Sequence, residues 1–245
     1  MSTIDEKRDM MKSGFGIAVI DSDQRKGLPQ PPSEKSVPTD AVLIDLPKPN
    51  RDIMTKPRLF DCIKDRKSRR KFTAESLALD ELSYLLWATQ GVREVMAGRG
   101  FRTVPSAGCR HPFDTYLAVS RVDGLEPGIY RYLALSHQLA LVEVASDIEA
   151  RVKAVSGGMT WIASAAVIFV WVVTPYRSEW RYAGEAQRVM LLDEGHVCQN
   201  LYLAAESLGC GTCAIGAFKQ TDIDAMFGLD GKEEFVLYCA PVGKV

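Results

Sequence analysis

The sequence predicts an α+β fold, in which helices pack against a mostly antiparallel β-sheet. Three strand-like segments follow one another closely, at 113–119, 128–133 and 137–144, and turn-forming residues separate them. Residues 165–173 form an uninterrupted apolar run rich in β-branched side chains, which is typical of a central strand covered on both faces. Residues 179–208 have the length and composition of one long, largely apolar helix that would be buried in a core or a subunit interface.

The first 58 residues differ in composition from the rest of the chain. They contain seven of the twelve prolines, which lack the backbone N–H that helices and sheet interiors need. Two short apolar runs, at 17–20 and 41–44, are suited to docking on a surface. We therefore expect an extended arm over 1–58 and a folded domain over 59–245.

The expected domain begins with two helices. The first is short and passes through Phe60 and Ile63. The second begins near Ala78, shows apolar residues at helical spacing, and ends at Gly91. The C-terminal part is expected to contain a strand, a short helix and a strand, at 212–215, 221–227 and 234–239.

Charge and composition exclude several classes of protein. Thirty basic and thirty-one acidic residues give a formal net charge of −1, so no overall field attracts nucleic acid or an anionic membrane. The N-terminus lacks the apolar run of a secretory signal, and the run at 165–173 is too short to span a bilayer. We therefore expect a cytoplasmic protein whose six cysteines are reduced thiols.

The densest functional signal is the basic stretch, residues 66–70, with the sequence Arg-Lys-Ser-Arg-Arg in the turn between the first two helices. Guanidinium groups bind phosphate through paired hydrogen bonds, and backbone amides near helix ends add donors. The stretch is thus suited to a phosphomonoester. The alternatives are a solvated basic face and a nucleic-acid patch, and composition alone favours the solvated face because the chain as a whole is not basic.

Two further segments are suited to close contact with a planar ligand. Residues 102–112 form a loop rich in small residues that leads into a strand, although an ordinary turn would have the same composition. Residues 208–216 run from the end of the long helix into a strand, and their glycines permit close approach of the backbone.

Two motifs within 208–216 do not support the functions they suggest. Gly209-x-Gly211-x-x-Ala214 follows a helix and enters a strand, which is the reverse of the order in a dinucleotide-binding turn. No second cysteine pair or spaced histidine pair completes a zinc site with Cys210 and Cys213, and a redox-active pair would begin a helix. We expect no metal site.

The three histidines are scattered and form no catalytic triad or helical zinc motif. His137 is expected in a hairpin turn. His196 is expected to be a hydrogen-bonded core residue of the long helix.

Taken together, these segments resemble the nitroreductase superfamily, and within it the SagB-type branch of FMN-dependent dehydrogenases and oxidases. The resemblance covers residues 60–245, including a hairpin at 124–132 and a buried helix at 195–203. The positions that it assigns to flavin contact are Arg66, Lys67, Ser68 and Arg70 in the basic stretch, Pro105, Ser106, Ala107 and Gly108 in a loop often contributed by the other subunit, and the backbone at Ala214, Ile215 and Gly216. Arg69 falls outside this set.

The resemblance implies a nitroreductase-like fold, an intertwined homodimer with FMN at the subunit interface, and an arm over 1–58 that wraps the partner. It implies an oxidoreductase whose FMN cycles between a hydride donor such as NAD(P)H and an acceptor. FAD is not excluded by the residues. Two alternatives stay open: a SagB-type oxidase acting on a peptide-derived substrate in a biosynthetic complex, and a non-catalytic flavin-binding protein.

The chain departs from the family pattern at several positions. Cys109 and His111 stand where many nitroreductases have Asn and Gln at the flavin edge. Many relatives carry basic phosphate ligands beyond the position that corresponds to residue 245. In this chain, Lys244 or Arg102 could take their role. Azoline oxidases have a catalytic Lys-Tyr pair where this chain has Arg181-Tyr182; Tyr182 could donate or accept a proton, whereas arginine stays protonated and cannot act as a base.

Overall fold

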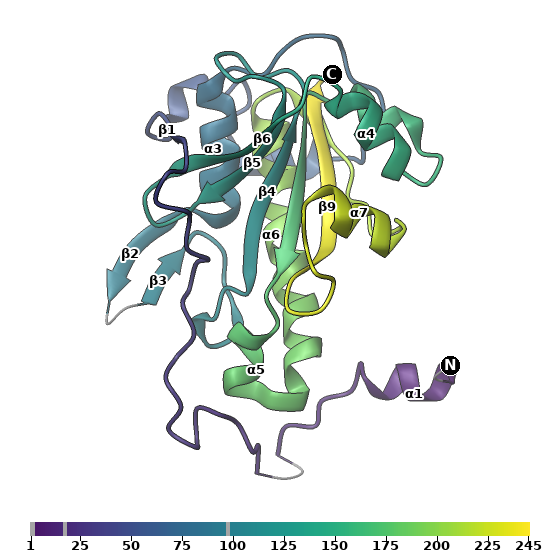
Figure 1. Ribbon diagram of the computed structural model, residues 1–245. Helices are drawn as coiled ribbons and strands as arrows, with labels where there is room; N and C mark the ends of the chain where they lie inside the picture. Colours follow the sequence, from purple (N-terminus) through teal and green to yellow (C-terminus); the bar gives the residue numbers. More distant parts are fainter. Residues whose placement is uncertain (1–2, 17–18, 97–98) are drawn as a thin grey trace.

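The computed structural model describes residues 3–16, 19–96 and 99–245 (Figure 1). Ile17 and Ala18, in the first apolar run of the arm, lie outside the described residues. Within the described part, no helix has both the length and the hydropathy needed to cross a membrane.

The centre of the fold is a seven-stranded sheet in which all neighbouring strands are antiparallel. The strands, in their spatial order, are β1 Leu43–Asp45, β6 Gln138–Val144, β5 Gly128–Leu133, β4 Phe113–Val119, β7 Val167–Val173, β9 Phe235–Lys244 and β8 Cys210–Thr212. This sheet and the helices around it confirm the predicted α+β class.

The central strands agree closely with the sequence pattern. The strands predicted over 113–119 and 128–133 have these bounds, and β7 begins two residues later than expected. Every residue of β4 and β7 is buried. β7 is wholly apolar, as a strand covered on both faces requires, and the buried Asp114 of β4 pairs with Arg177 at 2.7 Å. In contrast, β9 continues past the predicted end at 239, through Pro241 and Gly243, because β7 and β8 pair with it on its two sides.

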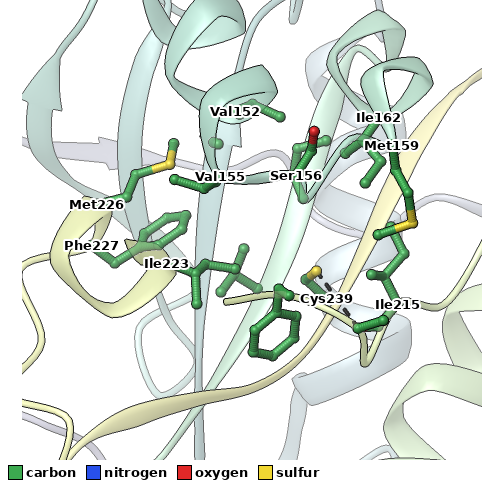
Figure 2. Close-up of a pocket in the computed structure, with 15 residues that line it drawn as sticks. Val152, Val155, Ser156, Met159, Ile162, Ile215, Ile223, Met226, Phe227 and Cys239 are labelled. Atoms are coloured by element: carbon green, nitrogen blue, oxygen red, sulfur yellow. Dashed lines mark hydrogen bonds between the residues drawn. The ribbon is translucent and has the colours of Figure 1, made fainter. Parts of the chain in front are cut away.

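Helices cover both faces of the sheet, and each face has its own core. Leu117 and Trp171 point to the face covered by α3 Leu79–Gln90 and α6 Ala186–Ser207. Their neighbours along the strands point to the other face, which α4 Ile148–Val155 and α7 Gln220–Met226 cover. Figure 2 shows the apolar side chains between α4, α7 and the sheet. Alternating side chains of one strand thus build two cores.

The predicted helix over 179–208 is wrong in one respect, because the chain breaks it into two. α5 (Tyr176–Tyr182) ends where Ala183 has a φ of 46°, which no right-handed helix can include. A single 3-10 turn (Ala183–Glu185) follows, and α6 then begins. The prediction for His196 is also wrong: its side chain lies on the exposed side of α6.

Smaller elements complete the fold. A separate hairpin of β2 (Val92–Met96) and β3 (Arg99–Arg102) has no counterpart in the predictions, because charged residues hide its strand pattern. His137 occupies a hairpin turn before β6, as expected. The remaining helices are α1 Ile4–Asp9 and α2 Leu59–Asp65, together with 3-10 turns at Arg51–Ile53, Ala107–Cys109 and Thr160–Ser164.

The arm docks on the domain of its own chain. The buried guanidinium of Arg102 donates to the Ser33 carbonyl at 3.1 Å, and that of Arg131 donates to the Ser36 carbonyl at 2.8 Å. The Glu34 carboxylate accepts hydrogen bonds from two backbone amides of the turn at 134–135. The arm then adds β1 to the edge of the sheet beside β6. The arm is thus mostly extended, with α1 and β1 as short regular elements.

Candidate functional site

The basic stretch lies beside the glycine-containing segment that follows α6. Helix α2 ends at Asp65, and Arg66 is its C-cap with extended backbone geometry. The chain then runs alongside β8, where the Arg69 amide donates to the Thr212 carbonyl at 2.9 Å. Ser68 and Thr212 form a parallel bridge. The fold therefore brings two of the three segments selected from the sequence together.

Tyr202 of α6 joins these two segments. Its hydroxyl lies 2.9 Å from the Ser68 hydroxyl and accepts a hydrogen bond from the Ala214 amide, also at 2.9 Å. The Arg66 guanidinium lies over its ring, 5.2 Å from the centroid. Sequence reasoning missed Tyr202, although an aromatic ring with a polar tip between the apolar residues Leu201 and Leu203 was a possible signal.

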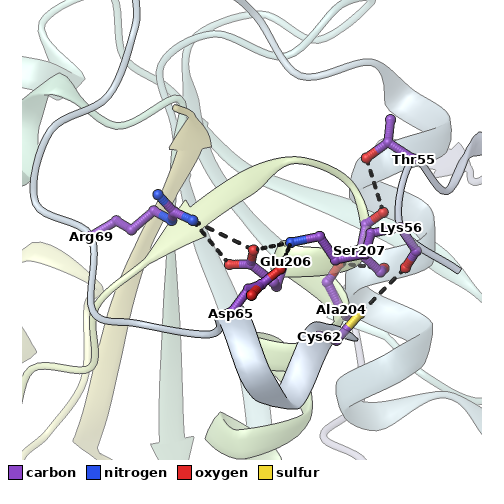
Figure 3. Close-up of polar contacts among 8 residues, drawn as sticks. All are labelled: Thr55, Lys56, Cys62, Asp65, Arg69, Ala204, Glu206 and Ser207. Atoms are coloured by element: carbon purple, nitrogen blue, oxygen red, sulfur yellow. Dashed lines mark hydrogen bonds and ion pairs between the residues drawn. The ribbon is translucent and has the colours of Figure 1, made fainter. Parts of the chain in front are cut away.

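Arg69 has a structural role that separates it from the other cations of the basic stretch (Figure 3). Its guanidinium pairs with the buried carboxylate of Glu206 at 3.3 Å, and Lys56 of the arm pairs with the same carboxylate at 2.7 Å. Gly211 leaves room for this arrangement, since a Cβ there would lie 2.7 Å from Arg69 Cδ. Glu206 thus neutralises Arg69 and fixes its direction.

The other three cations of the basic stretch are not neutralised in this way. Within the described residues, no carboxylate pairs with Arg66, Lys67 or Arg70. Arg70 lies over the Trp161 ring, 5.9 Å from the centroid, and Lys67 is exposed. Three cations beside the Ser68 hydroxyl form a donor set that fits a phosphate group.

The two cations considered as additional phosphate ligands have other partners. Lys244 pairs with the Glu81 carboxylate of α3. Arg102 is buried and donates to Gln90 Oε1 at 2.6 Å as well as to the arm. The hydrogen bonds and ion pair of these two side chains therefore direct them to partners other than the basic stretch.

Two of the three backbone amides at 214–216 donate hydrogen bonds within the fold. The Ala214 amide donates to Tyr202, and the Ile215 amide donates to the Cys239 carbonyl at 2.8 Å. For the Gly216 amide, the described residues provide no acceptor. Gly216 also packs near the Tyr238 ring, which a Cβ would approach to 3.4 Å. The Gly216 amide is thus the donor of this segment that an added planar ligand could use.

The loop at 105–108 is held by α6, at another position along that helix. The Ser106 hydroxyl donates to Asp193 at 2.6 Å, and the Ala107 amide donates to the same carboxylate at 3.0 Å. Burial raises the pKa of Asp193, opposed by these hydrogen bonds. Asp193 is a second residue that sequence reasoning missed. It fixes the loop to the N-terminal half of α6.

Tyr182 lies against the same loop. A Cβ on Gly108 would lie only 2.5 Å from the Tyr182 hydroxyl, and Gly108 has a φ of 58°. The Arg181 guanidinium lies 5.6 Å from the centroid of the Tyr182 ring, and the ring of Phe15 from the arm is perpendicular to that ring, with the two centroids 5.8 Å apart. The candidate catalytic tyrosine thus belongs with the loop at 105–108.

The predicted site residues therefore form two groups within one chain. The loop at 105–108 and Tyr182 lie near Asp193, whereas the basic stretch and Ala214 lie near Tyr202. These two positions are about 13 Å apart along α6, given its rise per residue. Among the described residues, no group of three or more His, Cys, Asp or Glu side chains could hold a metal ion.

Comparison with known proteins finds similar sequences over most of the chain. The model of the Nitroreductase family matches residues 63–244. The putative nitroreductase MJ1384 of Methanocaldococcus jannaschii is 33% identical over 187 residues, which cover 76% of this chain and 91% of that protein. The trifolitoxin-processing protein TfxB of Rhizobium leguminosarum bv. trifolii is 30% identical over 154 residues, which cover 61% of this chain but only 41% of that protein.

Solved structures share the fold. A putative nitroreductase from Ralstonia eutropha JMP134 has a TM-score of 0.68 and 26% identity, over 89% of this chain and 99% of that one. The NADPH:FMN oxidoreductase of Vibrio harveyi has a TM-score of 0.53 and 19% identity, over 76% of this chain and 68% of that one, which is a likeness of fold alone. From the family match and the 33% identical relative, the chain belongs to the nitroreductase family.

Proposed function

We propose that the protein is an FMN-dependent oxidoreductase whose basic stretch holds the phosphate of the flavin. The observation that carries this proposal is the set of three cations, Arg66, Lys67 and Arg70, beside the Ser68 hydroxyl and without carboxylate partners among the described residues. An open basic cluster next to a close-packed backbone segment suits a ligand with an anionic tail and a flat ring. The likeness to an FMN oxidoreductase fold agrees with this.

Each group of residues has a distinct part in this proposal. Arg66, Lys67 and Arg70 pair with the phosphate, and Ser68, held by Tyr202, adds a hydroxyl. The Gly216 amide would be available to the ring, while Ala214 and Ile215, whose amides bond within the fold, would shape the backbone behind it. Bound FMN supplies hydride and electron transfer, and the protein supplies position and electrostatics.

We further propose that a second copy of the chain completes each site. The loop at 105–108 contacts α6 near Asp193, whereas the basic stretch and Ala214 contact it near Tyr202, so within one chain the two groups are held at different positions along the helix. The outer face of α2 carries exposed apolar residues, with Leu59 at 62% and Phe60 at 75% exposure. Leu191 and Leu192 are exposed on α6. Such a surface is typical of a subunit interface.

In such a homodimer, Tyr182 is the candidate for moving a proton at the acceptor. Its hydroxyl is positioned by Gly108, and Arg181 beside it contributes positive charge without taking part in proton transfer. NAD(P)H is the expected hydride donor. The acceptor is a small molecule in this proposal.

The proposal is tested first by the flavin itself. Purified protein should show flavin absorbance, and the cofactor released on denaturation should be FMN. Arg66→Ala should weaken FMN binding by about 1.5 to 3 kcal/mol, because it removes a charge-assisted contact to phosphate. Lys64→Ala is the matched control, since it removes an exposed charge from the end of α2 and should leave binding unchanged. A colourless protein that takes up no added FMN would refute the assignment.

A second candidate function is favoured by the similarity to TfxB. TfxB is named as a protein that processes trifolitoxin, and the alternative that this similarity favours for the present chain is a SagB-type oxidase acting on a peptide-derived substrate. Turnover separates the candidates. Rapid reoxidation of the reduced flavin by quinones or nitroaromatics supports the general oxidoreductase, and activity only with a peptide and its partner proteins supports the alternative. No reoxidation by any acceptor would indicate a non-catalytic flavin-binding protein.

A further inference from the structure

A pocket of about 480 Å³, the arm pocket, lies between residues 35–42 of the arm and strands β4, β5 and β6. Strands β5 and β6 lie toward the β1 edge of the sheet, whereas the basic stretch lies beside β8 at the other edge. Tyr116, which lines the pocket, points to the face of the sheet covered by α4 and α7, and α6 covers the opposite face. The arm pocket is therefore separate from the proposed flavin site.

The Arg131 guanidinium is buried in the wall of the arm pocket without an acid beside it. Arg131 is 5% exposed, and its side chain donates to the Ser36 carbonyl at 2.8 Å. Among the described residues, it has no other hydrogen-bond partner and no carboxylate partner. None of its nitrogen atoms is both fully buried and unpartnered, so its remaining N–H groups open into the pocket. A buried charge is costly unless it is paired, and an anion in the pocket would pair with it.

The Tyr116 hydroxyl is a second polar group directed to the same pocket. Tyr116 of β4 lies directly opposite Arg131 of β5, so both side chains are on one face, with Cβ atoms about 5 Å apart. Tyr116 is 6% exposed, and its hydroxyl has no hydrogen-bond partner among the described residues. Its ring packs edge-on against the ring of Phe227, with centroids 6.0 Å apart, which fixes its direction. Burial raises the pKa of Tyr116, and the charges of Lys35 and Arg131 oppose this rise.

The other charged side chains that line the arm pocket do not supply the missing acid. Lys35 of the arm pairs with the Glu234 carboxylate. Glu143 of β6 pairs with the Arg151 guanidinium at 2.8 Å. Asp40 is exposed and forms no ion pair within the described part of the chain. The guanidinium between β4 and β6 is thus the buried charge that lacks a partner.

The rest of the pocket wall is largely apolar. Val37, Pro38 and Val42 line it from the arm, and Leu141 and Val142 line it from β6. A pocket with a cationic end and apolar walls fits a molecule with one negative charge and an apolar body. One guanidinium and one hydroxyl suit a carboxylate, because a carboxylate accepts paired N–H bonds from arginine and has lone pairs left for the hydroxyl.

We propose that the arm pocket binds a small organic carboxylate with an apolar body. The carboxylate lies between Arg131 and Tyr116, accepting hydrogen bonds from the guanidinium and from the hydroxyl. The apolar body lies against the arm at 37–42 and against β6. The site includes no residue of the proposed flavin site, and it does not depend on the proposed function.

The test titrates the full-length protein as purified, with whatever flavin it retains, and follows binding of three probes by NMR. Hexanoate has both the carboxylate and an apolar chain, hexanamide is its neutral counterpart, and acetate lacks the chain. Hexanoate should bind at least about tenfold more tightly than either of the other two, because it alone provides the charge and the apolar body. Equal affinity for hexanoate and hexanamide, or no binding of hexanoate, would overturn the proposal.

Variants place the bound carboxylate. Tyr116→Phe removes only a hydroxyl and should weaken hexanoate binding about three- to tenfold. Arg131→Gln should weaken it by about tenfold or more, because a charge-assisted contact is lost. Arg25→Gln is the matched control, since it removes the same charge from an exposed position of the arm and should leave binding unchanged.

A further variant separates the arm pocket from the proposed flavin site. Arg66→Ala removes a cation of the basic stretch and should leave hexanoate binding unchanged. Loss of hexanoate binding in Arg66→Ala, or unchanged binding in Tyr116→Phe, would place the anion elsewhere and contradict the proposal. Tyr116→Phe decides the site even if Arg131→Gln releases the arm from the domain, and flavin absorbance, read separately, decides the proposed function.

Discussion

Single residues decide how the cations of the basic stretch are used. Glu206, one of the few buried carboxylates, takes Arg69 and Lys56 as partners and leaves Arg66, Lys67 and Arg70 without an acid among the described residues. A buried carboxylate without these partners would be costly, so the pairing is strongly favoured. From the sequence, five polar residues in a row look alike. Their division into a structural arginine and an open cluster depends on one residue about 140 positions away.

Gly108 is a position where one added methyl group should matter. Gly108→Ala places a Cβ against the Tyr182 hydroxyl and the Arg181 side chain, so we expect a loss of about 1 to 3 kcal/mol in the free energy of unfolding and a displaced tyrosine. Denaturant titration measures the loss. Gly124→Ala is the control, since Gly124 also has a positive φ but no heavy atom lies within 4 Å of its would-be Cβ. Equal losses in both variants would show that backbone strain, and not the contact with Tyr182, is the cause.

At the scale of elements, α6 organises the candidate site. It supplies Asp193 to the loop at 105–108, and Tyr202 and Glu206 to the basic stretch. Its separation from α5 turns Tyr182 toward Gly108. The composition of 179–208 gives only a weak sign of this break, because Ala183 is a good helix former and the glycine beside it, Gly184, disfavours a helix by about 1 kcal/mol.

The break between α5 and α6 predicts opposite effects of glycine at two positions. Ala183→Gly should leave stability unchanged or raise it by up to about 1 kcal/mol, because alanine at a φ of 46° is strained. Gln199→Gly, at an exposed position inside α6, should lower stability by about 0.5 to 1 kcal/mol through lost helix propensity. Thermal or urea unfolding checks both. A destabilising Ala183→Gly would mean that the chain does not turn at this position.

At the scale of the whole molecule, the arm and the exposed faces of α2 and α6 form the surfaces that are available for binding. Arg102 and Arg131 hydrogen-bond residues 33–36 of the arm to the domain of the same chain, and the Phe15 ring contacts the Tyr182 ring. The arm therefore forms part of the surroundings of Tyr182 within one chain. Apolar residues on α2 and α6 remain exposed, and a second copy of the chain would cover them.

The proposed dimer makes a direct prediction. Sedimentation or light scattering should give the mass of two chains, and Phe60→Glu should give the mass of one, because it places a charge in the apolar surface of α2. The same variant should bind FMN more weakly, since each site is then incomplete. Val144→Glu, which alters an exposed apolar residue at the opposite edge of the fold, should remain dimeric. A wild-type protein that sediments as a monomer would contradict the interface.

The sequence by itself determined the α+β class, the bounds of β4 and β5, and the segments that carry the site, because hydrophobic periodicity and local residue chemistry are properties of neighbours in the chain. Only the tertiary structure decided that Tyr202 links Ser68 to Ala214, that Asp193 holds the loop at 105–108, and that these are two separate groups on one helix. Hydrogen bonds between residues far apart in the chain leave no local pattern. The break at Ala183 was decided in the same way, by packing that no single segment encodes.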